Sequence, residues 1–353
     1  MGRVIPVQNI YYLLLYAWNG LPEGKIIDVS GVVSPDLPNL FAKVLIEGVH
    51  QLQRRGLDRQ YVQNDEDLMR PRGRMLLGDT IRRGLLSRVQ VACSIDDLSH
   101  DVLHNQIIKS TLEKLARTHE IDSGQKDAIV GIVRSLDDIR SIAVTVSDFG
   151  RIQLHGNNAF YGLLLRVCAL VHEALMPEPG SGRFLFRDVL SDPQTMGLIF
   201  QDFIRNFFVL EQTEFAVKGE SFRWPVDEHY GCGHGLMPVM NTDTSLLSKS
   251  HAKAIIIECK WTPITLQRGK LRSEHLYQLN SYMRCHSRAC KSLAAVEGLL
   301  LYPLVDEPVD VAVRINEQRM RVRTIDLTTD WPNIRHQLLD LLQDQPLDCA
   351  PNI

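Results

Sequence analysis

The chain has 353 residues, of which 44% are hydrophobic and 23% are charged, and its formal net charge is −3. This composition is typical of a globular protein and argues against a disordered, collagen-like or coiled-coil chain. The length exceeds that of an average domain, so we expect two domains and place them at residues 1–150 and 151–353.

The nearly balanced charge excludes a protein that coats nucleic acid by charge alone, because such binding needs many Lys and Arg contacts to phosphate. A chain of this kind that acts on DNA needs a local basic groove or a partner. No apolar stretch is long enough to cross a bilayer, and no signal peptide is evident, so we expect a cytoplasmic protein without membrane contact. The seven cysteines are an odd set that fits reduced thiols.

The first predicted element is a helix over residues 6–18, with Asn9 as its N-cap and apolar residues at helical spacing. A second helix is expected over about residues 40–55. From residue 57 to residue 77 the pattern changes to short extended runs around a polar turn at residues 64–67. This pattern predicts a β-hairpin or two strands joined by a loop.

Further helices are predicted at about residues 101–116, 125–136, 158–175 and 195–210. The clearest linker-like stretch lies before the last of them, at Met176-Pro-Glu-Pro-Gly-Ser-Gly182. The mixture of helical and extended segments predicts an α+β fold: a mixed helical and β N-terminal domain, then a domain with a central mixed sheet flanked by helices.

Charged residues accompany two successive predicted strands. Residues 236–247 form a predicted strand that contains Asp243, and residues 254–260 form a β-prone run that ends in Glu258-Cys-Lys260. Positions two apart on a strand share a face, so Glu258 and Lys260 point the same way. If the two strands pair as a hairpin, Asp243 lies beside Glu258.

Two neighbouring carboxylates repel each other unless a cation joins them, and Mg²⁺ suits the pair because it takes oxygen ligands and keeps several waters. A bound metal lowers the pKa of a coordinated water and offsets charge on a phosphoryl oxygen. A neighbouring lysine can orient or deprotonate that water or stabilise the phosphate. The residues Asp243, Glu258 and Lys260 therefore suit phosphodiester hydrolysis.

By itself this triplet is a weak motif, because charged residues at strand ends are usually only solvated. It gains weight from the apolar run before Glu258 and from a following helix that places Gln278 and Tyr282, four residues apart, on one face. Without the strands, a half-buried helix face would explain these two residues better. Nearby basic residues include Arg268, Lys270 and Arg272, which suit contacts to DNA phosphate or, equally, a solvated charged loop.

The same residues carry a family resemblance. Glu258-Cys-Lys260 after a strand with Asp243, followed by Gln278-Leu-Asn-Ser-Tyr282, resembles the PD-(D/E)xK nucleases with the RecB-type Q-x-x-x-Y helix. The segments IPVQNIYYLLLYAW, QRRGL, RPRGRM, HNQIIKSTLEKL and PVMNTD resemble McrC, the family of nuclease subunits of McrBC modification-dependent restriction systems. This resemblance runs in the same order from the first helix to Trp331-Pro332.

The resemblance implies a type IV-like, Mg²⁺-dependent restriction endodeoxyribonuclease that acts with a hexameric AAA+ GTPase, McrB. In that family the partner binds GTP and reads the modified cytosine in double-stranded DNA. This agrees with the absence of a G-x-x-x-x-G-K-[S/T] loop in the chain. The resemblance also implies a catalytic site made of Asp243, Glu258, Lys260, Gln278 and Tyr282, with Asp243 and Glu258 as metal ligands.

The resemblance further implies that residues 1–150 dock on the GTPase and stimulate it, and that residues 151–353 form the endonuclease domain. The predicted hairpin at residues 57–77 is the candidate for a projection that enters the pore of the partner. Its basic residues Arg70, Arg72 and Arg74 are the candidate partner-binding residues, and surface arginines without a partner fit the pattern equally well.

The chain departs from the family pattern at three positions. The second acid of the family is often Asp, whereas Glu258 takes that place here, and either residue can ligate the metal. The family often has an arginine where Val239 stands, and a glutamate where Gln201 stands, which leaves the number of metal ions open. A second hypothesis, from a different class, is a regulatory subunit that mainly activates a partner AAA+ NTPase, with cleavage secondary or lost. A third is a nucleic-acid-binding module without catalysis. The intact Asp243, Glu258 and Lys260 favour the nuclease.

Overall fold

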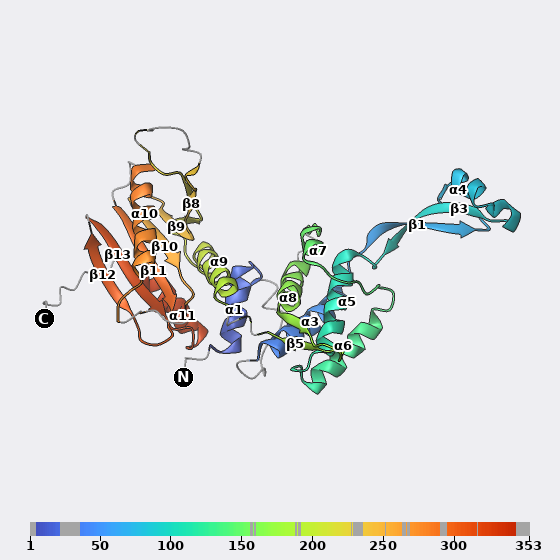
Figure 1. Cartoon of the computed structure of the whole chain (residues 1–353), viewed down its shortest axis with the longest axis horizontal. Helices are drawn as coiled ribbons and strands as arrows, with labels where there is room; N and C mark the ends of the chain where they lie inside the picture. The colour runs from blue at the N-terminus through green and yellow to red at the C-terminus, as the bar shows by residue number, and fades with distance from the viewer. Residues whose placement is uncertain are drawn as a thin grey trace. The chain divides into compact units, whose positions relative to one another are not determined.

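The computed structural model describes residues 5–21, 36–155, 158, 160–187, 189, 192–226, 228, 236–250, 252–262, 266, 269–289, 295–315 and 317–343. Within these residues the chain forms two compact units, which contain the elements labelled in Figure 1. None of the helices in these ranges combines the length and the apolar character that a membrane span requires.

The observed division differs from the predicted one at residue 150. The C-terminal unit contains α1 (Val7–Ala17) together with the elements from α9 (Pro193–Glu211) to α11 (Trp331–Asp340). The N-terminal unit contains the elements from α3 (Leu37–Arg55) to β5 (Phe184–Phe186). The prediction failed because α1 packs on α9, whereas the linker-like run after residue 175 belongs to a small hairpin that pairs within the N-terminal unit.

A six-stranded mixed sheet forms the centre of the C-terminal unit, in the order β12-β13-β11-β10-β9-β6. Its strands are β6 (Phe215–Lys218), β9 (Thr244–Ser248), β10 (Lys253–Cys259), β11 (Ala295–Pro303), β12 (Asp310–Ile315) and β13 (Gln318–Ile325). β11 runs parallel to both β10 and β13, and the other neighbours are antiparallel. The short strands β7 (Ser221–Phe222) and β8 (Met240–Asn241) pair separately. The predicted α+β class and central mixed sheet are confirmed.

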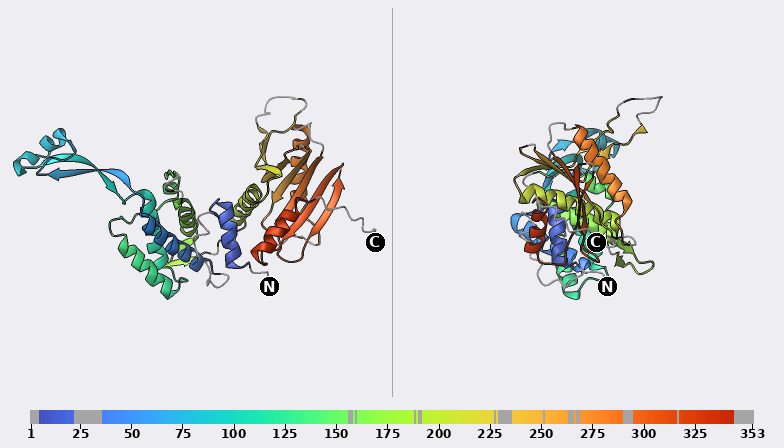
Figure 2. Two further views of the ribbon diagram at one scale, coloured as in Figure 1. Left: turned by 180° about the vertical axis from the view of Figure 1, so that it is seen from behind. Right: turned by 90° about the vertical axis from the view of Figure 1, so that its left-hand side faces the viewer.

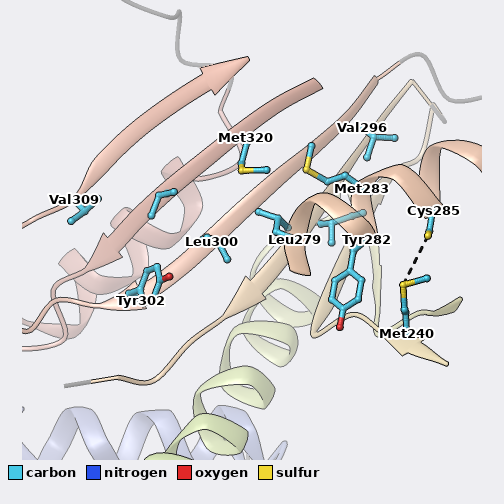
Figure 3. Packing of buried hydrophobic residues seen from close by; sticks show 12 residues of the cluster. Met240, Leu279, Tyr282, Met283, Cys285, Val296, Leu300, Tyr302, Val309 and Met320 are labelled. Carbon is cyan, nitrogen blue, oxygen red and sulfur yellow. Dashed lines mark hydrogen bonds between the residues drawn. The ribbon is translucent and has the colours of Figure 1, made fainter. Parts of the chain in front are cut away.

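Helices cover both faces of this sheet (Figure 2). α9 packs on β6, β9 and β10, and α10 (Ser273–Ala289) packs on β10 and β11. Figure 3 shows Leu279 and Met283 of α10 in one buried cluster with Leu300 of the sheet. Gly298 on β11 permits this close approach, because a Cβ there would collide with the Met283 sulfur and lie 3.0 Å from Leu279 atoms.

Helix α1 joins the C-terminal unit through polar and aromatic contacts. Asn9 lies inside the helix rather than at its N-cap, and its amide nitrogen donates to the carbonyl oxygens of Leu327 (2.8 Å) and Thr329 (2.7 Å). The ring of Tyr16 stacks on Trp331 with 5.1 Å between centroids. The N-cap prediction is therefore wrong, because this asparagine makes a tertiary contact that local sequence does not reveal.

The N-terminal unit is built mainly of helices. Besides α3, these are α5 (Leu103–Ala116), α6 (Ser123–Ser135), α7 (Val146–Gly150) and α8 (Tyr161–Ala174), and β4 (Leu175–Pro177) pairs with β5. α5 packs against both α6 and α8. The predicted helices at residues 40–55, 101–116, 125–136 and 158–175 are thus confirmed within a few residues at their ends.

A three-stranded antiparallel sheet extends from these helices (Figure 1). It consists of β1 (Gln60–Leu68), β2 (Arg74–Met75) and β3 (Val91–Ser99), with α4 (Leu77–Arg82) and the 3-10 helix η1 (Leu85–Arg88) inserted between β2 and β3. We call residues 60–99 the projecting sheet. The predicted hairpin at residues 57–77 is too short, and its turn at residues 64–67 is wrong, because β1 continues through these residues and pairs with the distant β3.

The base of the projecting sheet is fixed by a buried polar network. The Tyr161 hydroxyl accepts from the backbone N–H of Asp58 (2.9 Å) and donates to the side-chain oxygen of Asn105 (2.8 Å). The Asn105 amide in turn donates to the carbonyl oxygens of Asp58 (3.1 Å) and His100 (2.8 Å). One tyrosine and one asparagine of the helical body therefore hold the chain just before β1 and just after β3.

The tertiary role of Asn9 can be tested by stability. Asn9→Ala leaves two carbonyl oxygens without their donor, so we expect the free energy of unfolding of the C-terminal unit to fall by roughly 1–3 kcal/mol. Thermal or urea unfolding measures the change. Asn333→Ala, at an exposed position of α11, is the matched control and should have little effect. Equal losses for the two variants would contradict this role for Asn9.

Candidate active site

Asp243 and Glu258 meet because β9 and β10 pair as an antiparallel hairpin. Thr244 lies opposite Ile257, so the residue before β9 comes next to Glu258 near the end of β10. The Asp243 carboxylate is fixed there, since its Oδ2 accepts from the backbone N–H of Cys259 at 2.7 Å. The structure thus brings the two predicted acids together, as the strand pairing required.

Two residues of α9 hold Asp243 from the other side. Arg205 donates from Nε (2.8 Å) and Nη2 (2.7 Å) to the carbonyl oxygen of Asp243, and also pairs with Asp202 at 3.1 Å. The Gln201 amide fits between them: its nitrogen donates to Asp243 Oδ1 at 3.1 Å while its oxygen accepts from Arg205 Nη2 at 2.7 Å. Gln201 therefore stands directly on the carboxylate, where a glutamate would add a third acid.

A continuous hydrogen-bonded chain links Glu258 to α10. The Lys260 ammonium donates to Glu258 Oε1 and to Gln278 Oε1, each at 2.8 Å. The Gln278 amide nitrogen then donates to the Tyr282 hydroxyl at 2.9 Å. All five residues predicted for one site are therefore neighbours. Gln278 orients the lysine, and Tyr282 fixes the direction of the Gln278 amide.

The site places two carboxylates in a largely buried environment. Glu258 is only 1% exposed, and burial together with the charge of Asp243 raises its pKa to about 7, although Lys260 opposes this. Burial also raises the pKa of Asp243, against the Cys259 N–H and the charges of Lys260 and Arg205. Both carboxylates resist ionisation until a further positive charge arrives, which is the electrostatic demand of a cation site.

The side chains present fit a hard divalent cation. Glu258 Oε2 is buried and has no hydrogen-bond partner, so one carboxylate oxygen is free to act as a ligand. Across the described ranges, His, Cys, Asp and Glu form no cluster of three that could hold a metal ion. Asp243 and Glu258 are thus a two-carboxylate set, which suits Mg²⁺ because this ion commonly takes one or two carboxylates and keeps several waters.

With this geometry established, comparisons with known proteins decide the family. The family described as McrBC 5-methylcytosine restriction system component matches residues 10–303. The chain is also 31% identical over 345 residues to the type IV methyl-directed restriction enzyme EcoKMcrBC of Escherichia coli strain K12, covering 97% of this chain and 98% of that protein. This chain belongs to the McrBC family. The predicted resemblance to McrC is confirmed.

The fold of this McrBC-family chain also matches a solved structure. A chain of the refined half-complex from the tetradecameric assembly of Thermococcus gammatolerans McrB AAA+ hexamers with bound McrC superposes with a TM-score of 0.55. The match covers 94% of this chain and 76% of that chain at 15% identity. At this identity the likeness concerns the fold alone.

The other predicted contact residues of the McrBC-family chain lie in two places. Arg268 is outside the described residues, and Lys270 is exposed just before α10. Arg272, which directly precedes α10, donates to the Thr262 hydroxyl at 3.4 Å. The three arginines predicted to bind the partner, Arg70, Arg72 and Arg74, lie on the projecting sheet and are exposed.

Arg205 is the site residue that sequence reasoning missed. It lies one helical turn after Gln201, at a spacing of four, so both side chains leave α9 on the same face. That spacing was the available signal once Gln201 had been singled out. The signal is weak, since a single arginine on an amphipathic helix is usually a surface residue.

The raised pKa of Glu258 predicts that, in the absence of metal, the free energy of unfolding depends on pH. Its pKa of about 7 lies above the ordinary 4.5, so the folded state holds a proton that the unfolded state releases between these pH values. The free energy of unfolding therefore falls as pH rises through this window. Glu258→Gln removes the charge, so at pH 8 in EDTA the variant should be more stable than wild type by up to about 3 kcal/mol.

Thermal unfolding at pH 8 and pH 6 measures this difference, which should shrink at pH 6. Glu307→Gln, at an exposed position, is the matched control and should match wild type at both pH values. A Glu258→Gln variant that is less stable than wild type at pH 8 would contradict the electrostatic description of the site.

Proposed function

We propose that this chain is the Mg²⁺-dependent endonuclease subunit of a McrBC-type restriction complex. The observation that carries the proposal is the contiguous arrangement of Asp243, Glu258 and Lys260 at the end of the β9–β10 hairpin, with Lys260 held by Gln278. Membership of the McrBC family supports it, since the Escherichia coli relative is a methyl-directed restriction enzyme. The substrate is double-stranded DNA that contains modified cytosine.

Phosphodiester hydrolysis forms a bond between a water oxygen and phosphorus and breaks one P–O ester bond, giving a phosphate monoester and a hydroxyl. Asp243 and Glu258 would hold the Mg²⁺. When bound, this ion supplies an acidified water and neutralises charge on a phosphoryl oxygen. The carboxylates are preorganised for it, since Cys259 and Gln201 fix Asp243 and Lys260 fixes one oxygen of Glu258.

Lys260 has the role of stabilising the negative charge that builds up on the phosphate in the transition state. Its ammonium carries three donors, and two of them are taken by Glu258 and Gln278. The third remains for the substrate. Because the first two contacts fix the position of Nζ, the lysine needs little reorganisation at the moment of reaction, which is the condition under which such a charge contributes most.

The partner in this proposal is a hexameric AAA+ GTPase, and the docking element is the projecting sheet. The solved structure with the same fold contains McrB AAA+ hexamers with bound McrC. Large apolar side chains that are 51–75% exposed gather at the far end of this sheet, and we call them the tip patch: Met69, Met75, Leu77, Ile81, Leu86 and Val89. Such a group is uncommon on a surface that meets only water and marks an interaction site.

Basic residues accompany the tip patch. Arg70, Arg72 and Arg74 lie on the same segment, and Arg72 pairs with Asp97 at 3.1 Å while its side chain stays 71% exposed. Gly73 between them has φ +72, and a Cβ there would collide with the Ser94 carbonyl oxygen, so only glycine fits this turn. The turn thereby sets the directions of the two flanking arginines, which we propose contact the partner and stimulate its GTP hydrolysis.

The alternative is a regulatory subunit that mainly activates the partner NTPase. The projecting sheet favours this function as much as it favours the first, because docking and cleavage belong to different units of the chain. The two functions are separable for the same reason. Variants of the site should remove cleavage alone, and variants of the tip patch should remove stimulation.

Asp243→Ala and Lys260→Ala test the nuclease. With the AAA+ partner, GTP, Mg²⁺ and a plasmid that contains 5-methylcytosine, both variants should lose cleavage by at least roughly a hundredfold. They should still stimulate GTP hydrolysis. Asp306→Ala, at an exposed position, is the control and should cut normally. Cleavage by both site variants would show that the site assignment is wrong, and a wild type that stimulates without cutting would favour the regulatory function.

Ile81→Asp tests the docking element. Ile81 is 72% exposed, so the charge should leave the folded chain intact, yet it should abolish stimulation of the partner GTPase if the tip patch is buried on docking. Val146→Asp introduces the same charge at a side chain that is also 72% exposed but lies outside the projecting sheet, and should leave stimulation unchanged. Full stimulation by Ile81→Asp would exclude the tip patch from the interface.

A further inference from the structure

A second polar cluster lies beside Lys260, at the start of α10. The backbone N–H of Lys260 donates to the carbonyl oxygen of Leu301 at 2.9 Å, so the next residue of β11, Tyr302, is the neighbour of Lys260 on the adjoining strand. Tyr302 is fully buried, and its hydroxyl lies 2.8 Å from Nδ1 of His275. His275 lies three residues before Gln278, so both side chains lie on the same face of α10.

The contact with Tyr302 allows the imidazole of His275 to present a hydrogen-bond donor at Nε2. Burial raises the pKa of Tyr302 to about 12, so the hydroxyl keeps its proton and can donate it to Nδ1. Burial, reinforced by the charge of Lys260, holds the pKa of His275 below its usual value, so the ring is neutral. A neutral ring that accepts at Nδ1 carries its proton on Nε2, and this nitrogen is then a hydrogen-bond donor.

Arg272 adds a second donor to the same place. Its side chain is 30% exposed, its bond to the Thr262 hydroxyl is long at 3.4 Å, and its Nε is buried without a hydrogen-bond partner. A guanidinium presents five donors in a fixed plane, so much of the donor capacity of Arg272 is unused.

The position of one carboxylate oxygen indicates where an anion would bind. Oε1 of Glu274 lies 3.7 Å from Arg272 Nη1 and 3.7 Å from His275 Nε2. Both distances exceed those of a hydrogen bond, and the Glu274 side chain is 70% exposed. An exposed carboxylate held loosely between two donors is easily replaced by a phosphate oxygen, which accepts from both at full hydrogen-bond strength.

We propose that Arg272 and His275 form a binding subsite for one DNA phosphate next to the phosphate that is cleaved, with Tyr302 as the positioning residue of His275 and Glu274 as the group that the DNA displaces. This inference rests on the proposed nuclease function. The subsite would bind the sugar-phosphate backbone of the DNA. Two donors that converge on one anionic oxygen do not distinguish one base from another.

The subsite would set the register of the strand relative to Lys260. β10 and β11 supply Lys260 and Tyr302 as neighbours, and α10 supplies His275 and Gln278 one turn apart, so the same two strands and one helix fix both the lysine and the subsite. A strand held at two points has less freedom to slide or rotate at the reacting phosphate. This positioning lowers the entropy that must be lost to reach the transition state.

Binding of a 30-base-pair duplex to the full-length chain in EDTA, followed by fluorescence anisotropy across a salt series, tests the subsite. Arg272→Ala and His275→Ala should each weaken binding roughly tenfold, and Arg272→Ala should reduce the slope of log K against log salt by about 0.9. Glu274→Gln should strengthen binding, because the competing carboxylate is gone. Arg314→Ala, an exposed arginine of the edge strand β12, is the control and should change none of these values appreciably.

Cleavage by the complex with the AAA+ partner separates positioning from folding. His275→Ala and Tyr302→Phe should raise KM for the plasmid severalfold while thermal unfolding remains close to that of wild type, and His275→Gln, which retains an N–H donor, should recover part of the loss. A wild type that binds DNA and cuts, with Arg272→Ala and His275→Ala unchanged in affinity and KM, would overturn the subsite alone. A wild type that neither binds nor cuts would overturn the nuclease proposal together with the subsite.

Discussion

The pairing of the buried Glu258 carboxylate with the half-buried Asp243 carboxylate is the constraint around which the candidate site of the C-terminal unit is organised. Asp243 and Glu258 lie side by side at the end of a hairpin, and their neighbours keep this unfavourable pair in place: a backbone N–H, an arginine on a carbonyl, a glutamine amide and one lysine. None of these groups cancels both charges, as the raised pKa values of the two acids show. The two acids are therefore only partly compensated by positive charge, which costs stability, and under the proposed function a bound divalent cation would supply the missing charge.

Helix α10 packs on the sheet with one face and makes the polar contacts of the candidate site with the other. Its apolar side chains enter the cluster on the sheet, where Gly298 allows an unusually close approach, and its polar side chains reach Lys260 and Tyr302. Close packing therefore does more than stabilise the unit. Because Gln278 and Tyr282 are locked to a rigid helix on a rigid sheet, the hydrogen bonds to Lys260 keep their direction, which loops could not guarantee.

The candidate functional surface of the N-terminal unit is exposed rather than buried. Among the described residues, Tyr161 and Asn105 hold the base of its projecting sheet, while the far end exposes a tip patch of large apolar side chains among arginines. Exposed apolar surface of this kind is costly in water and fits burial against the proposed partner. The proposed division of labour thus has a physical basis, with one unit preorganised for a small ion and the other shaped for a large protein surface.

The sequence alone determined the α+β class and most helices, and it predicted that Asp243, Glu258 and Lys260 lie together, because helical periodicity, β-branched runs and the i, i+2 and i, i+4 rules act over a few residues. It also carried the family resemblance. Only the tertiary structure decided the rest. The pairing of β1 with β3, the placement of α1 on α9, and the contacts of Asn9, Arg205 and Tyr302 join residues far apart in the chain. Their partners depend on packing that no local pattern encodes, which is why the domain boundary and the extent of the projecting sheet were predicted wrongly.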